Sequence, residues 1–200
     1  MARRTHVRGL SLIELMVVLT VIGLMLMVAI PGFGNWIQNS RIRSVAEEVQ
    51  NGLRLAQSEA VNRNRRVAFV RTNATPARNA APAANGTNWY VQVLPLASEV
   101  GDATFDATSY VQGGAFSVQS GATLAGREVF CFNSVGRVIN DNNTLLGADC
   151  VAPADAANPE DLNITLGTND RSMRVELFLG GRVRMCDVNA ASGQPNACTP

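Results

Sequence analysis

The stretch VRGLSLIELMVVL, residues 7–19, places a single carboxylate, Glu14, at the start of a long apolar segment. From residue 10 to residue 30 nearly every side chain is apolar, and at about 1.5 Å of rise per residue this length just spans the hydrocarbon core of a bilayer. Three arginines precede the segment, so the positive-inside bias keeps the N-terminus in the cytoplasm. We therefore expect a membrane-spanning helix over residues 10–30 and an extracytoplasmic remainder.

Two ordinary explanations of this segment leave residues unexplained. A cleaved secretory signal has an apolar core of about 7–15 residues and ends in a site of small residues, whereas this run ends in AIPG, residues 29–32. An uncleaved signal anchor fits the hydropathy, but Glu14 would then lie in lipid at a cost of up to about 3 kcal/mol. A cut between Gly9 and Leu10 removes the difficulty, because the new α-amine of Leu10 would lie one helical turn from Glu14.

The basic leader that ends in Gly9, followed by LSLIEL at residues 10–15, resembles the class III signal of type IV pilins and pseudopilins. The resemblance implies that a prepilin peptidase cleaves after Gly9 and methylates Leu10, which stands where the family usually has Phe. It implies that Glu14 meets the N-terminus of a neighbouring subunit during assembly. It also implies a single-pass inner-membrane protein with a periplasmic head, whose partners are other minor pilins or pseudopilins and the inner-membrane assembly platform.

Residues 31–64 predict a second, amphipathic half of the same helix. Pro31 cannot donate to the carbonyl of Met27, so we expect a kink or a locally melted turn there. Beyond it, one apolar stripe recurs at steps of three and four residues and should pack on a globular head. Its members are Ile42, Val45, Ala46, Val49, Leu53, Ala56 and Ala60. Asn62 and Asn64 are expected to end the helix.

The segment LAQSEAVNR, residues 55–63, followed by a strand at residues 66–71, is similar to the segment that marks the GspH/FimT family of minor pilins and pseudopilins. The resemblance implies an α+β, type IV pilin-like fold, in which a leader of residues 1–9 and the long helix precede an antiparallel β-sheet head, residues 65–200. It implies a minor pilin-like subunit of the type IV pilus, FimT/FimU-like, in the tip or priming complex. The alternative is a GspH-type pseudopilin of the type II secretion system, because the two kinds of subunit share this layout.

Short β-type runs follow the helix, and we expect them to form antiparallel sheet. They cover residues 67–70, 89–94, 115–118, 128–132, 162–166, 173–179 and 182–186. Residues 72–88 are rich in Ala, Asn and Pro, which predicts a mobile insertion between the first two strands. Residues 98–114 and 151–161 predict similar loops.

The four cysteines lie in the extracytoplasmic part, where an even count predicts two disulfides. Three pairings are open, and we favour Cys131 with Cys150 and Cys186 with Cys198, because each closes a loop rich in Gly, Asn or Pro. The sequence has no C-x-x-C, and its sole histidine, His6, lies in the leader, so we expect no zinc site. The lack of a mature histidine, of a P-loop and of a dinucleotide fingerprint indicates that the protein is not an enzyme and has no cofactor.

The stretch GGRVRMC, residues 180–186, is the best candidate for ligand binding. A Gly-Gly turn leads into a strand in which Arg182 and Arg184 should share one face, with Cα atoms roughly 7 Å apart. This spacing suits two guanidinium groups that grip successive phosphates. The segment also resembles the C-terminal G-R-x-R motif of FimT-type minor pilins that bind DNA during natural transformation, which implies contacts from Gly181, Arg182 and Arg184.

A purely structural explanation of these arginines stays open. They could guard an exposed edge strand against unwanted pairing, or face acidic neighbours in a filament. Residues 67–200 hold 8 Arg against 12 Asp and Glu, a net charge of −4. Any basic patch must therefore be local, with Arg137 or Arg171 as its further members, and DNA binding would depend steeply on salt.

Overall fold

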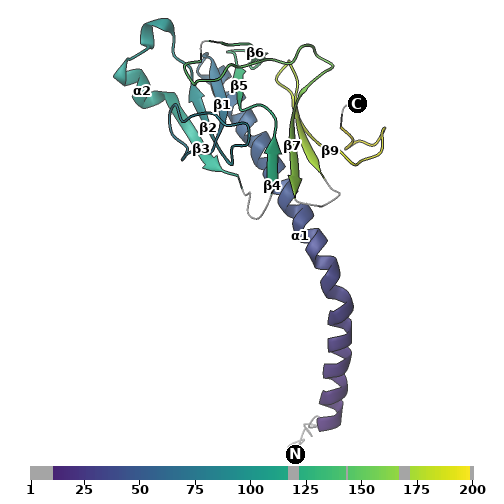
Figure 1. Ribbon diagram of the computed structural model, residues 1–200. Coiled ribbons are helices and arrows are strands. Elements are labelled where there is room, and N and C mark those ends of the chain that lie inside the picture. The colour runs from purple at the N-terminus through teal and green to yellow at the C-terminus, as the bar shows by residue number, and fades with distance from the viewer. Residues whose placement is uncertain (1–10, 117–121, 143, 167–171, 199–200) are drawn as a thin grey trace, which may run out of the picture. The chain divides into compact units, whose positions relative to one another are not determined.

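The computed structural model describes residues 11–116, 122–142, 144–166 and 172–198. The chain divides into two compact units, Met1–Asn39 and Ser40–Pro200, and one long helix belongs to both. This helix, α1, covers Leu12–Asn62 (Figure 1). The prediction of one long helix that ends near Asn62 is therefore confirmed.

In the first unit, α1 exposes its apolar side chains. The exposed fraction is 79% for Leu12, 67% for Leu24 and 76% for Met27. Among the described residues, no helix combines the length and the apolarity that a bilayer crossing requires. The helical assignment continues through Pro31, so the backbone there is not a melted turn, and a kink at Pro31 stays a prediction.

In the second unit, the apolar stripe of α1 is buried as predicted. The seven side chains of the stripe, from Ile42 to Ala60, are at most 1% exposed. The helix then ends in a left-handed residue, Asn64, with φ of 52°. The Asn64 N–H donates to the Val61 carbonyl at 3.2 Å and the Arg65 N–H donates to the Ala60 carbonyl at 3.0 Å. This pattern is a Schellman motif, which satisfies the last carbonyls of the helix.

The head contains two antiparallel sheets, and Figure 1 shows the C-terminal part of α1 behind their strands. The first sheet has the order β3-β2-β1-β5-β6. Its strands are β1 (Val67–Thr72), β2 (Asn88–Val93), β3 (Tyr110–Ala115), β5 (Val129–Phe132) and β6 (Val138–Ile139). The second sheet has the order β4-β7-β8-β9. Its strands are β4 (Ala122–Ala125), β7 (Glu160–Leu166), β8 (Met173–Leu177) and β9 (Val183–Asp187).

One apolar core joins the stripe of α1 to the inner faces of both sheets. Phe69 and Phe130 of the first sheet and Leu162 and Val175 of the second belong to it, and all four are fully buried. Burying a side chain of this size contributes about 1.5–3 kcal/mol. The α+β fold class predicted from the sequence is confirmed.

Six strand predictions are confirmed, and one is tested only in part. The strands expected at residues 67–70, 89–94, 128–132, 162–166, 173–179 and 182–186 are β1, β2, β5, β7, β8 and β9. The strand expected at 115–118 meets β3 only at Ala115, and residues 117–118 lie outside the described residues. The short strands β4 and β6 were not predicted, because two to four residues carry no clear alternation.

The prediction of a loop at residues 98–114 is wrong, because this range contains a helix and most of a strand. A 3-10 turn, η1 (Ala97–Glu99), precedes α2 (Ala103–Ser109). Asp102 caps α2 by accepting from the Thr104 N–H at 2.7 Å. Strand β3 follows and contains Gly113. A Cβ there would lie 2.7 Å from the Trp89 carbonyl oxygen, so this position requires glycine. Glycine is unusual inside strands, and the sequence therefore did not indicate a strand here.

Residues 72–88, expected as a mobile insertion, are anchored by buried polar side chains. Arg71 is fully buried and donates to the Ala84 carbonyl at 2.5 Å and the Leu124 carbonyl at 2.8 Å. The hydroxyl of Tyr90 donates to the Ala80 carbonyl at 2.7 Å. Burial lowers the pKa of Arg71 to about 10, against the opposing charge of Glu128. The hydrogen bonds to main-chain carbonyls offset the free-energy cost of burying this guanidinium.

Candidate functional site

The processing signal lies mostly outside the described residues. Gly9 and Leu10 are not among them, so their cleavage and methylation remain predictions. Glu14 lies in the first turn of α1 and is exposed. A carboxylate at that place faces the positive end of the helix dipole. The position is therefore suited to a carboxylate that meets a cationic N-terminus.

The GGRVRMC stretch forms the turn between β8 and β9 and most of β9. The Gly181 N–H donates to the Phe178 carbonyl at 2.8 Å, and the Phe178 N–H donates to the Arg182 carbonyl at 3.0 Å. Gly181 has φ of 87°, the left-handed conformation that closes a three-residue hairpin loop. Arg182 therefore lies just before β9, and Arg184 lies within it.

The two arginines of this stretch have different surroundings. Arg182 is exposed, and its guanidinium carbon lies 3.8 Å from the centre of the Phe178 ring. Arg184 donates through Nε to Oε2 of Glu176 at 3.0 Å and through Nη2 to the Ala197 carbonyl at 2.8 Å. Glu176 is fully buried. Arg184 is therefore hydrogen-bonded within the head, whereas Arg182 is exposed and stacks on the Phe178 ring.

Arg184 belongs to a charge network on the outer face of the second sheet. Asp161 lies directly across from Glu176, and Arg174 pairs with Asp161 at 2.9 Å. Burial raises the pKa of Asp161, and Arg174 opposes the shift. Two carboxylates that face each other repel, so each needs its arginine. The network is balanced, and its arginines are engaged by acidic partners within the head.

Both favoured cysteine pairs are present in the structure. Cys131 is joined to Cys150 and Cys186 is joined to Cys198, with Cα–Cα distances of 5.6 and 4.9 Å. The second disulfide ties the C-terminal segment to β9, where the Asp187 N–H donates to the Asn196 carbonyl at 2.8 Å. Among the described residues, Cys186 and Cys198 form a group of metal-type ligands with Glu176. Because their sulfur atoms are bonded to each other, the group is not a metal site.

A second exposed arginine lies on the turn that packs against the turn carrying Arg182. The turn between β5 and β6 carries Gly136 and then Arg137, which is exposed. This turn touches the turn between β8 and β9, since the Val138 N–H donates to the Leu179 carbonyl at 3.2 Å. Arg171, the other predicted helper, lies outside the described residues. The structure thus brings Arg137 to Arg182 on adjacent turns.

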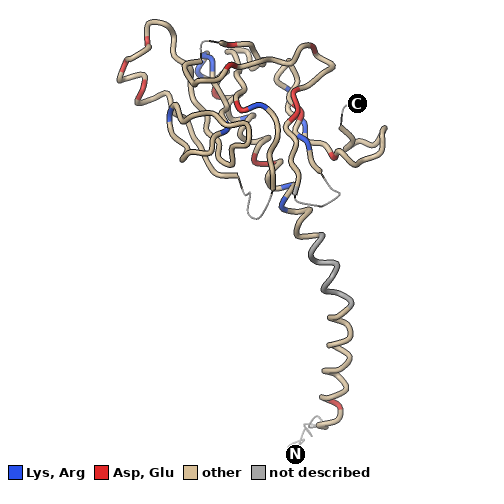
Figure 2. The backbone as a smooth tube through the Cα atoms, in the orientation of Figure 1, with Lys and Arg blue, Asp and Glu red and all other residues tan. Residues whose placement is uncertain are grey.

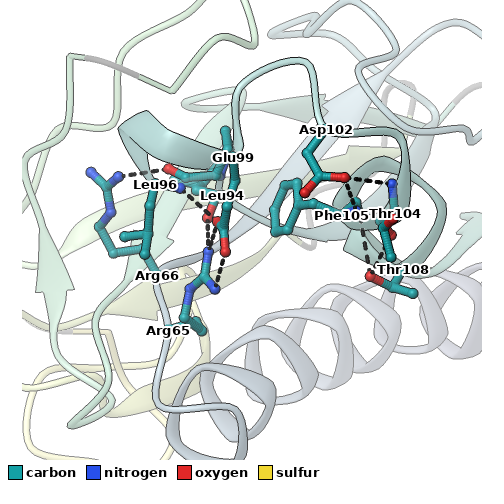
Figure 3. Close-up of polar contacts among 10 residues, drawn as sticks. Arg65, Arg66, Leu94, Leu96, Glu99, Asp102, Thr104, Phe105 and Thr108 are labelled. Carbon is teal, nitrogen blue, oxygen red and sulfur yellow. Dashed lines mark hydrogen bonds and ion pairs between the residues drawn. The ribbon is translucent and has the colours of Figure 1, made fainter.

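Basic and acidic residues are interspersed along the backbone of the head, as Figure 2 shows. Much of the remaining charge is structural. Arg65 donates to both carboxylate oxygens of Glu99, which in turn accepts from the Leu96 N–H at 2.9 Å (Figure 3). The hydrogen bond from Arg65 lowers the pKa of Glu99. This cluster fastens the segment that follows α1 to η1.

Two family models match the chain. A family model described as type II transport protein GspH matches residues 45–181, and one described as a prokaryotic N-terminal methylation motif matches residues 4–30. No curated protein matches the sequence.

The chain is also similar to solved structures. The type IV minor pilin FimU of Pseudomonas aeruginosa has 15% identity and a TM-score of 0.49, over 80% of this chain and 98% of that chain. The minor pseudopilin EpsH from the type 2 secretion system of Vibrio cholerae has 13% identity and a TM-score of 0.43, over 72% and 95%.

Proposed function

The chain belongs to the GspH family, and we propose that it is a minor pilin-like subunit of a type IV pilus that assembles into the tip or priming complex. One observation carries this proposal: an N-terminal methylation motif at residues 4–30 precedes a GspH region at residues 45–181 in the same chain. The family implies processing by a prepilin peptidase and assembly with other pilins or pseudopilins. Its members are structural components, and we assign the chain no catalysis.

We propose that residues 10–30 anchor the subunit in the inner membrane before assembly, with the head in the periplasm. The exposed apolar side chains of α1 support this, because a bare apolar helix needs lipid or other helices around it. The two disulfides fit an oxidising periplasm. In this proposal Glu14 neutralises the N-terminal amine of a neighbouring subunit once Gly9 has been cut from Leu10.

The test is the fate of the N-terminus and of Glu14 in the native cell. Mass spectrometry of protein purified from the envelope should show that residues 1–9 are gone and that Leu10 is methylated. Glu14→Val should leave cleavage intact and block incorporation into the filament. Thr20→Val, which also removes a polar side chain from the apolar segment, is the matched control and should incorporate normally. A retained leader, or normal incorporation of Glu14→Val, would contradict the proposal.

The alternative is a GspH-type pseudopilin of a type II secretion system, in keeping with the description of the matching family. Deletion of the gene separates the two. Loss of pili with normal protein secretion is expected for the minor pilin. Accumulation of secreted proteins in the periplasm, with normal pili, would favour the pseudopilin.

DNA binding is a second proposed activity, and the surroundings of the arginines support a narrower form of it than the sequence predicted. Arg182 and Arg137 are exposed on adjacent turns, so we assign them the phosphate contacts. Gly181 shapes the turn, and Arg184 stabilises the head from inside. Two arginines contact few phosphates, so binding should be weak and independent of base sequence.

The experiment is fluorescence anisotropy of a labelled DNA duplex with the full chain in detergent. Arg137→Ala with Arg182→Ala should weaken binding and lower the salt slope by about 0.9 for each lost phosphate contact. Arg41→Ala with Arg43→Ala removes two exposed arginines from α1, near the other end of the stripe, and is the charge-matched control. Equal binding by the double variant and the unmodified protein would remove the DNA proposal.

A further inference from the structure

Three elements of the head meet at a single hydrogen bond. Gln57 of α1 donates through Nε2 to the carbonyl of Gly136 at 2.7 Å. Gly136 lies in the turn between β5 and β6, and Gly181, in the turn between β8 and β9, covers this bond. A Cβ on Gly181 would lie 2.0 Å from the Gly136 oxygen and 2.3 Å from Nε2 of Gln57. The backbone of Gly181 is therefore packed directly on the Gln57 contact.

This junction sets how the two turns lie relative to each other. The turns belong to different sheets, and the ladders of neither sheet include both of them. Besides the Gln57 contact, the Val138 N–H donates to the Leu179 carbonyl at 3.2 Å. Each glycine of the junction is followed at once by an exposed arginine, Arg137 or Arg182. A shift of one turn against the other would therefore change the spacing of the two guanidinium groups.

We infer that Gln57 is the positioning residue of a phosphate-binding surface made by Arg137 and Arg182. The inference rests on the proposed DNA binding and adds to it a residue that touches no DNA. By holding Gly136 against Gly181, Gln57 fixes the distance between the two arginine-bearing turns before DNA arrives. A surface that is already arranged loses less conformational entropy on binding than one that must be ordered by its ligand.

The junction needs a hydrogen-bond donor at residue 57, which the amide of Gln57 supplies. The acceptor is a main-chain carbonyl, so the side chain from α1 must donate and must reach across to the turn. A carboxylate of the same shape would place an oxygen against the Gly136 oxygen and push the turn away. Gln57→Glu therefore removes the donor with almost no change in volume. Gln57→Met also removes the donor, and it introduces no charge.

The same helix supplies a matched control. Gln50 also lies on α1 and is also half-buried, and its Nε2 donates to the Val183 carbonyl at 3.4 Å. This contact is made to the first residue of β9, next to Arg182, and it does not involve Gly136, Gly181 or the junction between the two turns. Gln50→Glu removes a donor of the same kind from the same helix face of the head, so it reports any general effect of such a change.

The experiment measures the anisotropy of a labelled DNA duplex over a series of salt concentrations, with the full chain in detergent and below the unfolding temperature of each variant. Gln57→Glu should weaken DNA binding about tenfold at low salt and lower the salt slope by up to about 1.8, the value for two lost phosphate contacts. Gln50→Glu should keep the slope. A purely structural role for Gln57 would lower the unfolding temperature and leave the slope unchanged.

A second comparison tests whether Gln57 acts through the arginines. In a chain that already carries Arg137→Ala and Arg182→Ala, adding Gln57→Glu should cause no further loss of DNA binding. A full additional loss, or an unchanged slope in Gln57→Glu alone, would overturn the inference. If Gln57→Glu does not fold, Gln57→Met is measured under the same criteria. The proposed DNA binding fails by a different result: the variant with Arg137→Ala and Arg182→Ala would then bind DNA as well as the unmodified protein does.

Discussion

Arg184 lies directly across from Glu176 in the β8–β9 ladder, and its Nε donates to a carboxylate oxygen that is fully buried. Arg184 also reaches the Ala197 carbonyl, so it joins the sheet to the C-terminal segment. A buried carboxylate without a cation would lose several kcal/mol of solvation. The second arginine of the G-R-x-R stretch therefore has a structural role.

Arg184→Ala should destabilise the head much more than Arg182→Ala. Breaking a fully buried ion pair costs about 3–5 kcal/mol. Because the Arg184 side chain is 35% exposed, solvent reduces the loss, and we expect about 2–3 kcal/mol. Arg182→Ala should cost under about 1 kcal/mol, as is usual for exposed side chains. Urea denaturation measures both, and equal losses would contradict the distinction between the two arginines.

Asp161→Asn should stabilise the head at neutral pH. Burial raises the pKa of this carboxyl, so the folded state holds the proton more tightly than the unfolded state. The free energy of unfolding therefore falls as pH rises from the ordinary Asp range through the raised pKa, and it stays lower above that. Asparagine removes the charge and still offers an acceptor to Arg174.

The check is denaturant unfolding at pH 7 and at about pH 3, below the ordinary pKa of Asp. The advantage of Asp161→Asn over the unmodified head should be present at the higher pH and absent at the lower one. Asp155→Asn is the control, because hydrogen bonds from Asn158 and Ala157 lower the pKa of that exposed carboxyl and give the opposite sign. An equal difference at both pH values would contradict this assignment.

Gly181→Ala should destabilise the head, and Gly180→Ala should not. A side chain at Gly181 would strike the Gly136 oxygen, and the φ of 87° costs an L-residue about 1–2 kcal/mol in addition. A Cβ at Gly180 would meet no atom within 4 Å. Thermal unfolding of the two single variants compares neighbouring glycines in one turn, and equal melting temperatures would contradict the close packing there.

Replacing Cys186 and Cys198 by Ala should loosen the C-terminal segment without unfolding the first sheet. The bridge closes a short loop whose other attachments include the hydrogen bonds to Asp187, Arg184 and Ser172. Hydrogen exchange of residues 188–197 should accelerate, while that of β1 and β2 stays slow.

Replacing Cys131 and Cys150 by Ala is the comparison for this experiment. Both cysteines are buried against β1 and β2 in a smaller core cluster. We expect a loss of about 2–4 kcal/mol and faster exchange in the first sheet. The same exchange pattern in both double variants would show that the two bridges do not have separate roles.

The long helix, its buried stripe and most strands could be predicted from the sequence, because they depend on periodicities that a local stretch carries by itself. Asp102 was a visible N-cap signal for α2, and a search for capping residues would have found it. The role of Arg184 could not be predicted, because it depends on which residue the hairpin register places opposite. Gln57 was missed for the same reason, since its partner lies 79 residues away.

The guanidinium of Arg71 donates to main-chain carbonyls, at Ala84 in the loop after β1 and at Leu124, Gly126 and Arg127 beyond it. Such recognition is indifferent to the side chains that the loop displays outward. Substitutions at outward-facing positions of this loop that keep the path of the backbone should therefore change the free energy of unfolding little. Among the outward positions of this stretch, Arg78 and Asn79 are exceptions, because Arg78 pairs with Asp106 and Asn79 accepts from Gln92.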